Sequence, residues 1–249
     1  MGRRKSLLDS DVSCFRSLGI QAPGYEGNVR KNEDTTRVVD ATFQHFGRID
    51  ILVNAADGNF LVPAEDLSPN GFKTVMDIDS VGTFRTFHEA LKYIKNGGLG
   101  RETSGGGTIL NISATLHYTA TWYQIHVSAA TAAIDAMTRS LALEWGTDYD
   151  IRVNGIAPGP INGTPGLSKL DPHEMKSIQS GASMHQFISG EKWDIAMAAL
   201  YLASDAGDWF NRASHVSKEA VKEMSRSVEK RSRSGAPALE SGVPTRSKM

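Results

Sequence analysis

The chain has almost no cysteine, no long apolar run and no excess of charge of either sign. Cys14 is the only cysteine among 249 residues, so no internal disulfide can form and we expect a reducing compartment. No run of about twenty apolar residues could span a bilayer, and the N-terminal residues lack the apolar core of a secretory signal. A net charge of −1 gives no overall attraction to nucleic acid or to an anionic membrane. These absences leave a globular chain with one sizeable core, or one domain and a tail.

Along the chain, apolar runs alternate with segments of helical periodicity. The pattern predicts helices over 6–18, 32–46, 68–94 and 123–145, and strands over 49–54, 108–113 and 151–156. Ser68 and Pro69 supply a cap and a first-turn proline, while Gly19, Gly47 and Gly146 follow the ends of three helices. Strands that alternate with helices predict an α/β fold, a doubly wound parallel sheet covered on both faces.

Three distinctive segments follow the predicted strands, at the edge where such sheets bind ligands. They are 54–60 (Asn-Ala-Ala-Asp-Gly-Asn-Phe), 113–115 (Ser-Ala-Thr) and 157–164 (Ala-Pro-Gly-Pro-Ile-Asn-Gly-Thr). Small residues in the first let a flat cofactor approach the backbone, and the rigid Pro-Gly-Pro turn can present main-chain groups to a planar amide. Each segment alone is weak evidence, but their order and spacing indicate a nucleotide site.

These motifs, together with segments 47–56, 73–79 and 132–139, resemble the short-chain dehydrogenase/reductase superfamily. Within it, the chain is similar to the peroxisomal 2,4-dienoyl-CoA reductases, particularly those of plants. The superfamily's usual catalytic asparagine, serine and tyrosine are replaced here by Asp79, Ala114 and Val127, as they are in this subfamily. The resemblance implies a Rossmann-like, short-chain dehydrogenase/reductase fold over residues 1–210 and a basic, helical or disordered tail over 211–249.

The resemblance also implies chemistry on a conjugated carbon chain. Val127 cannot donate a proton to a ketone oxygen, so a ketone reductase is disfavoured. Hydride transfer from NADPH to the far end of a 2,4-dienoyl-CoA would give a dienolate, and protonation nearer the thioester would give a 3-enoyl-CoA. Asp79 in an apolar pocket would have its pKa raised by desolvation and could supply that proton, directly or through water. The alternative is a helix residue satisfied by a local hydrogen bond.

Binding residues follow from the same resemblance. Arg3, Arg4 and Lys5 match the position just after the family's second strand, where cations can hold the 2′-phosphate of NADP. Asn28 provides an amide that can face the adenine. Arg30 and Lys169 suit the phosphates of coenzyme A, and Phe60 suits the acyl chain. The full cofactor set is Arg3, Arg4, Lys5, Asn28, Asn54, Ala55, Ala56, Pro158, Gly159, Pro160, Ile161, Asn162, Gly163 and Thr164; the substrate set is Arg30, Phe60, Ser68, Asn70 and Lys169.

Three departures from the family bear on activity. Thr131 stands where the subfamily has a catalytic lysine that holds the nicotinamide ribose, and threonine has neither the reach nor the charge. No Gly-x-x-x-Gly-x-Gly segment follows a strand, so the usual cradle for the pyrophosphate is missing. The usual final strand with Asp-Gly-Gly is also missing. We therefore expect a chain truncated at its N-terminus with impaired turnover. The alternative is a non-catalytic relative, at most a subunit of an intact paralogue.

The tail suggests an address. Its last three residues, Ser247-Lys248-Met249, resemble the Ser-Lys-Leu signal that an import receptor reads, so we expect a peroxisomal protein. From His215 onward there are eight Lys or Arg and four Asp or Glu, with a helix predicted over 217–231. RNA binding is disfavoured because no aromatic platform accompanies these charges. The family resemblance implies a homo-oligomer, and His126 and His185 lack the spacing of a zinc site.

Overall fold

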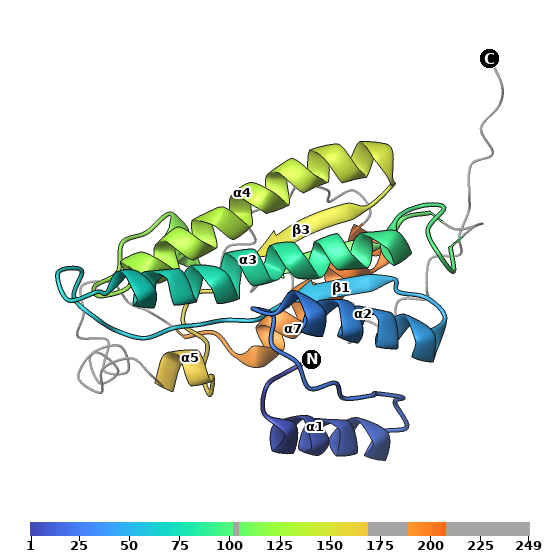
Figure 1. Ribbon diagram of the computed structural model, residues 1–249, viewed down its shortest axis with the longest axis horizontal. Helices are drawn as coiled ribbons and strands as arrows, with labels where there is room; N and C mark the ends of the chain where they lie inside the picture. Colours follow the sequence, from blue (N-terminus) through green and yellow to red (C-terminus); the bar gives the residue numbers. More distant parts are fainter. Residues whose placement is uncertain (102–104, 169–188, 208–249) are drawn as a thin grey trace, which may run out of the picture.

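The computed structural model describes residues 1–101, 105–168 and 189–207. The sheet has three parallel strands, and Figure 1 shows the long helices α3 and α4 along one of its faces and α7 along the other. The strands β1 (Ile51–Asn54), β2 (Thr108–Ile112) and β3 (Arg152–Ile156) lie in that order, with Ile51 opposite Thr108 and Thr108 opposite Arg152. This arrangement confirms the predicted α/β fold with a parallel sheet.

The core has two layers because side chains on a strand alternate between the two faces of the sheet. Ile109 and Val153 are fully buried and pack with Phe87 of α3 (Pro69–Ile94) and Ala142 of α4 (Ile125–Asp148). Leu110 and Ile156 lie on the other face, where Ala198 and Leu202 of α7 (Lys192–Ala203) cover them. Strands β2 and β3 are therefore buried on both sides, as their unbroken apolar runs predict.

Two helices begin and end where the sequence predicts. Helix α2 (Asn32–Phe46) has Glu33 and Asp34 in its first turn and ends at Gly47, whose φ of +76° is the left-handed conformation that glycine adopts without strain. At the start of α3, the Ser68 hydroxyl accepts a hydrogen bond from the Gly71 backbone N–H at 3.0 Å.

Helix α4 was predicted wrongly at both ends. The predicted span 123–145 becomes Ile125–Asp148, because Tyr123 has a positive φ of +64° and because the helix continues through Gly146. Trp145 explains the continuation, since it is buried and meets Phe87 edge-on at 5.4 Å, and its carbonyl accepts from the Tyr149 N–H. Packing of the indole thus outweighs the local tendency of glycine to end a helix.

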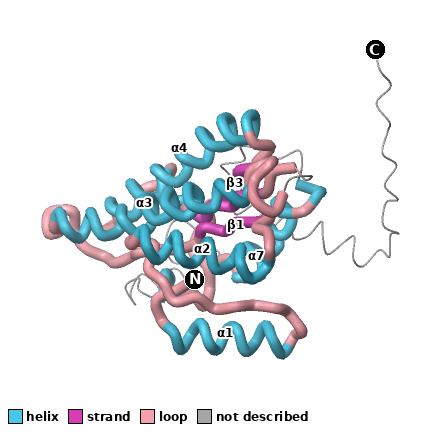
Figure 2. Tube along the Cα trace, turned by 45° about the vertical axis from the view of Figure 1, so that its right-hand side comes forward, coloured by secondary structure: helices cyan, strands magenta, loops and turns pink. Residues whose placement is uncertain are grey.

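The N-terminal segment lies apart from the three-stranded sheet. Figures 1 and 2 show α1 (Lys5–Ser17) beside the body of the molecule, and none of its residues is buried. A single parallel bridge joins Gly2 to Glu26. Ile51 and Val53, on the face of β1 away from α3, are about half exposed. Strand β1 is thus an edge strand of the described sheet.

Short elements complete the described chain. Thr115–His117 (η1) and Asp205–Gly207 (η2) are single 3-10 turns, and α5 (Pro165–Ser168) is one short helical turn. The predicted tail helix over 217–231 lies outside the described residues. Among those that are described, the structure contains no helix with the length and apolar character needed to traverse a bilayer.

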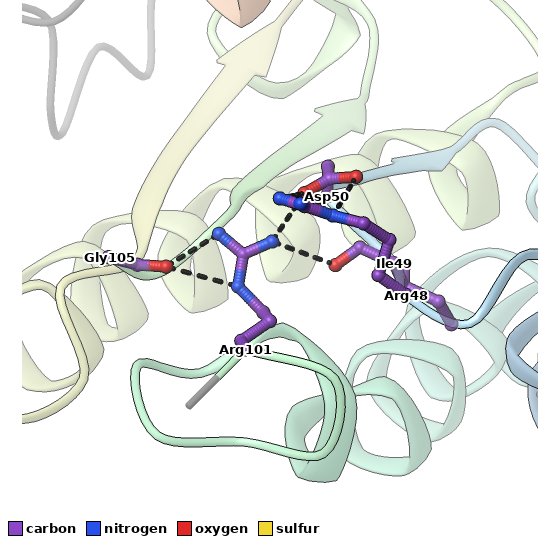
Figure 3. Close-up of polar contacts among 5 residues, drawn as sticks. All are labelled: Arg48, Ile49, Asp50, Arg101 and Gly105. Carbon is purple, nitrogen blue, oxygen red and sulfur yellow. Dashed lines mark hydrogen bonds and ion pairs between the residues drawn. The ribbon is translucent and has the colours of Figure 1, made fainter. Parts of the chain in front are cut away.

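Arg101 joins the amino ends of β1 and β2, an arrangement called here the arginine clamp. Figure 3 shows the buried Arg101 guanidinium reaching the Asp50 carboxylate, the Ile49 carbonyl and the Gly105 carbonyl. Asp50 precedes β1 and Gly105 precedes β2, so one side chain ties both strand entrances. Arg48 contacts the same carboxylate from the exposed side at 2.9 Å through Nε. This end of the sheet is therefore a structural clamp, and the opposite end holds the candidate site.

Candidate active site at the carboxyl ends of the strands

Three buried polar side chains at one side of the site, Asn54, Asn111 and Thr138, are joined by hydrogen bonds. The Asn54 side chain, at the last residue of β1, donates from Nδ2 to Asn111 Oδ1 at 2.9 Å, and Asn111 donates to the Thr138 hydroxyl at 2.9 Å. All three are nearly or fully buried. Asn54 thus links β1 to β2 and α4, while Ala55 after it is exposed and Ala56 half-buried. The structure places the small residues of this loop where a flat group could approach the backbone.

Asp79 holds the same loop from α3. Its carboxylate is 2% exposed, and Oδ1 accepts a hydrogen bond from the Gly58 backbone N–H at 2.7 Å. This contact is not local to the helix, since the two residues are 21 positions apart. A Cβ at Gly58 would come within 2.9 Å of Ile78, so glycine lets the loop approach α3. Asp79 therefore anchors the loop that carries Phe60.

Phe60 lies between α3 and the start of α4. It packs with the cluster of Val75, Val127 and Ala130, and its ring stacks on His126 with centroids 4.3 Å apart. His126 is fully buried, and its Nε2 lies 3.0 Å from the Phe60 carbonyl oxygen. The predicted acyl-chain residue is thus in an apolar setting between the two long helices.

The segment after β2 is held by a buried acidic residue of α4. Ser113 donates to Asp135 Oδ1 at 2.9 Å, and His117 Nδ1 lies 2.7 Å from Asp135 Oδ2. His117 Nδ1 is also 2.7 Å from the Ala114 carbonyl, and Leu116 packs on the Val75 and Val127 cluster. Ala114, predicted to stand where the superfamily has a serine, is therefore fixed by its neighbours on both sides.

The Pro-Gly-Pro turn closes the third side of the site. Its Pro158 carbonyl accepts from Thr115 N–H at 3.0 Å, which joins the segments that follow β2 and β3. Pro160 and Asn162 exchange backbone hydrogen bonds with Gly190, and Thr164 donates to the Ile161 carbonyl. The remaining predicted cofactor residues, Gly159, Ile161 and Gly163, lie in this same turn, where Gly163 has a φ of +66°. Asn54 and Pro158 thus lie at the same edge of the parallel sheet, and Asp79 of α3 reaches the loop after β1 through Gly58.

Thr131 lies one turn beyond Val127 on α4, at the position where the family resemblance predicts a lysine. Its hydroxyl lies 3.0 Å from the Val127 carbonyl and 3.1 Å from the Ser128 carbonyl, both on its own helix. The side chain is 4% exposed. A hydroxyl used in this way supplies neither a cation nor a free donor toward a ligand. Thr131 therefore cannot supply the positive charge that a lysine would place at this position.

Arg3, Arg4 and Lys5, which are predicted to bind the 2′-phosphate, lie at or just before the start of α1. Arg3 and Arg4 are exposed, Arg4 precedes α1, and Lys5 pairs with Asp9 at 2.8 Å. Asn28 uses its own side chain within its turn, since Oδ1 accepts from the Arg30 backbone N–H at 3.1 Å. The side-chain contacts of Lys5 and Asn28 are thus local, the first within α1 and the second within one turn.

The coenzyme A residues are only partly gathered. Arg30 is half-exposed and lies 3.9 Å from Asp77, whose carboxylate also pairs with Lys73, and Lys73 lowers the pKa of Asp77. Ser68 and Asn70 are exposed at the start of α3, where Ser68 caps the helix. Lys169 lies outside the described residues. The Ser68 contact shows a structural role for a residue predicted to bind substrate.

A shallow depression of about 370 Å³ lies away from all of these residues. It is lined by Arg16, Ile20, Pro23 and His45 beside α1, and it contains none of the predicted site residues. The candidate site is therefore defined by converging strand ends and polar contacts.

Comparison with known proteins decides the family. A family model described as Enoyl-(Acyl carrier protein) reductase matches residues 12–218. A protein of Arabidopsis thaliana named peroxisomal 2,4-dienoyl-CoA reductase, (3E)-enoyl-CoA-producing, is 64% identical over 98% of this chain and 85% of its own length. The chain belongs to the peroxisomal 2,4-dienoyl-CoA reductase family. The protein of the same name from Danio rerio is 45% identical over 73% of this chain, which spans 58% of that relative's length.

The fold of this reductase also has solved relatives. A short-chain dehydrogenase from Bacillus anthracis is 37% identical over 86% of this chain and 80% of its own, with a TM-score of 0.68. The doubly wound family fold is thus established by sequence and by structure.

Several polar residues of the reductase site escaped the sequence prediction. Asn111, Asp135 and His126 are each buried and each contact a predicted site residue or its neighbour. The available signal was a polar side chain within an otherwise apolar strand or alanine-rich helix, since buried polar groups require partners. The sequence gives no local signal of the bond between His126 and Phe60, because it joins residues 66 positions apart.

Proposed function

We propose that this chain is an NADPH-dependent 2,4-dienoyl-CoA reductase of peroxisomal β-oxidation whose turnover is strongly reduced by Thr131. The oxidoreductase class, the acyl-CoA substrate and the peroxisomal location follow from its family. The choice of NADPH over NADH, the identity of the site residues and the loss of turnover are the proposal. The observation that carries it is the buried Asp79 beside the glycine of the β1 loop, with no tyrosine at Val127 and no serine at Ala114.

The nucleotide fits one end of this arrangement. Ala55, Ala56 and the Pro158–Thr164 turn can accept the nicotinamide and its ribose, because small side chains and main-chain groups lie at the strand ends. The pyrophosphate end has no glycine-rich turn in the sequence. NADPH supplies a hydride when bound; Arg3 and Arg4 are the cations proposed for its 2′-phosphate.

The chain's own residues then account for the rest of the reaction. Hydride addition at the far end of the diene leaves an electron pair shared with the thioester oxygen, and a proton must reach the carbon nearer the thioester. Asp79 is the proposed proton donor at that step, since Val127 cannot supply one. Phe60 and the Val127 cluster exclude water around the acyl chain. Thr131 leaves the developing negative charge without a nearby cation, which explains the proposed low rate.

A two-stage measurement tests this function. Fluorescence titration should detect NADPH binding, and subsequent addition of a 2,4-dienoyl-CoA should cause slow NADPH oxidation with a 3-enoyl-CoA as product. NADPH binding without any oxidation would favour the second candidate, a non-catalytic relative that associates with an intact paralogue. The specific observation behind that candidate is the Thr131 hydroxyl, whose two contacts lie on its own helix.

A further inference from the structure

His126 is a buried histidine whose two ring nitrogens have different surroundings. Nε2 lies 3.0 Å from the Phe60 carbonyl oxygen, so this nitrogen carries the hydrogen and donates it. Within the described part of the chain, Nδ1 is buried and has no hydrogen-bond partner. Burial lowers the pKa of His126, and the Phe60 carbonyl opposes this effect. The ring is therefore neutral near pH 7, with its proton directed to Phe60.

This arrangement is costly for a residue that only fills space. An unpartnered buried nitrogen costs about 1–3 kcal/mol, which an apolar side chain at the same place would avoid. The neighbouring cluster of Val75, Val127 and Ala130 is apolar and would accept a phenylalanine or leucine. The feature that such a replacement would lose is the hydrogen bond from Nε2 to Phe60.

Phe60 is held by His126 at both its backbone and its ring. The imidazole stacks on the phenyl ring with centroids 4.3 Å apart and planes at 29°, while Nε2 binds the carbonyl of the same residue. Two residues further on, Val62 N–H donates to the Tyr123 carbonyl at 3.2 Å, in the segment just before α4. Asp79 fixes the other side of the loop through Gly58. The loop is thus bound to α3 through Asp79, to α4 through His126, and to the segment just before α4 through Tyr123.

We propose that His126 is a positioning residue for the acyl-CoA, which sets the orientation of Phe60 against the acyl chain without contacting the nucleotide. The inference rests on the proposed function, because it uses Phe60 as the acyl-chain contact. His126 acts through Phe60 and takes no part in proton transfer. Loss of the Nε2 bond should therefore weaken acyl-CoA binding and leave NADPH binding unchanged.

Matched substitutions of His126 separate positioning from packing. In a glutamine the Nε2 amide can occupy the place of the imidazole Nε2, whereas the shorter asparagine reaches only the place of Nδ1. A phenylalanine retains the stacked ring and removes the donor. All three are made in the full chain and compared by thermal melting, so that a loss of binding is judged only between folded proteins.

Two ligands give the readout. Hexanoyl-CoA, which is saturated and cannot react, is titrated by calorimetry, and NADPH is titrated by fluorescence. We expect H126F and H126N to bind hexanoyl-CoA about tenfold more weakly than wild type, the loss of one net hydrogen bond, and H126Q to restore binding to within about threefold. NADPH affinity should change less than about twofold in each.

Several results would overturn the inference. It is wrong if H126F or H126N binds hexanoyl-CoA as well as wild type, or if NADPH affinity falls in parallel with that of hexanoyl-CoA. Should H126F and H126N fail to fold, the His126 ring nitrogens of wild type are followed by NMR, where hexanoyl-CoA but not NADPH must shift them. A wild-type chain that binds neither ligand refutes the proposed function, whereas intact binding with unaffected variants refutes only the role of His126.

Discussion

The Asp79 carboxylate accepts a hydrogen bond from the Gly58 backbone N–H at 2.7 Å, and this contact joins the middle of α3 to the loop after β1. The Asp79 carboxyl group, which in its protonated form is the proton donor of the proposed reaction, is thus also the anchor of the loop that carries Phe60. A substitution at Asp79 can therefore act through chemistry, through loop position, or through both.

Asp79→Asn separates these two roles. The asparagine Oδ1 can still accept from Gly58, so the loop should stay in place, but an amide cannot donate the required proton. We expect dienoyl-CoA reduction to fall by about 100-fold or more, with hexanoyl-CoA affinity retained. The assay compares steady-state NADPH oxidation in a Thr131→Lys background, where turnover is large enough to follow. Equal rates with and without the substitution would remove Asp79 from the mechanism.

Thr131→Lys should restore the missing cation. A lysine at this position of α4 would place positive charge near the oxyanion, and we expect turnover to rise by about 10- to 1000-fold. Thr131→Met is the control, because it has similar length and no charge. If the lysine variant is folded and binds NADPH yet reacts no faster than Thr131→Met, the explanation for low turnover is wrong.

The charge at the N-terminus should decide between NADPH and NADH. Arg3→Ala and Arg4→Ala together should weaken NADPH binding by about tenfold or more and leave NADH binding unchanged, since only NADPH carries the 2′-phosphate. Lys5→Ala should have a smaller effect, because Lys5 already pairs with Asp9. Fluorescence titration with both nucleotides measures the ratio. An unchanged ratio in the double variant would show that the 2′-phosphate binds elsewhere.

The arginine clamp should contribute to stability and not to binding. Arg101→Met removes a buried guanidinium that reaches Asp50, Ile49 and Gly105, and we expect the free energy of unfolding to fall by about 2–3 kcal/mol. Arg48→Met should have a much smaller effect, although Arg48 contacts the same Asp50 carboxylate, because it is exposed. Urea titration compares the two. Similar losses in both variants would contradict a special role for the buried partner.

The free energy of unfolding should fall as the pH drops below about 6.5, because His126 is buried. Burial holds its native pKa below the ordinary value of about 6.5, so the unfolded chain binds a proton there that the native chain does not. Stability is therefore full above about pH 6.5 and declines as the pH falls toward the native pKa, by at most about 1.4 kcal/mol per pH unit. His126→Gln should flatten this decline in urea titrations between pH 5 and 7. An unaltered slope would show that other groups cause it.

Asp50 adds a separate effect at lower pH. Burial alone would raise its pKa, but the Arg48 and Arg101 guanidiniums outweigh burial and hold the pKa below 3.8. Its contribution to stability is thus present above about pH 4 and is lost only as the pH falls further, which keeps it apart from the window of His126.

The local features of the fold could be predicted from the sequence because they depend on residues within one turn of each other. Gly47 ends α2 through its own positive φ, and Ser68 caps α3 through a contact only three residues long. The apolar strand runs and the segments that follow them also indicated the ligand-binding edge and the doubly wound fold. Where a local signal competed with packing, as at Gly146 beside the buried Trp145, the prediction of the helix end was wrong.

The sequence by itself thus determined the family, the order of the strands and helices along the chain, and the threonine at position 131. Only the tertiary structure decided which partner each buried polar group takes. Asp79 meets Gly58 across 21 residues, Asn54 meets Asn111 across 57, and His126 meets Phe60 across 66. The physical reason is that these bonds form only after the parallel sheet has brought its strand ends together, where each buried donor or acceptor must find a partner.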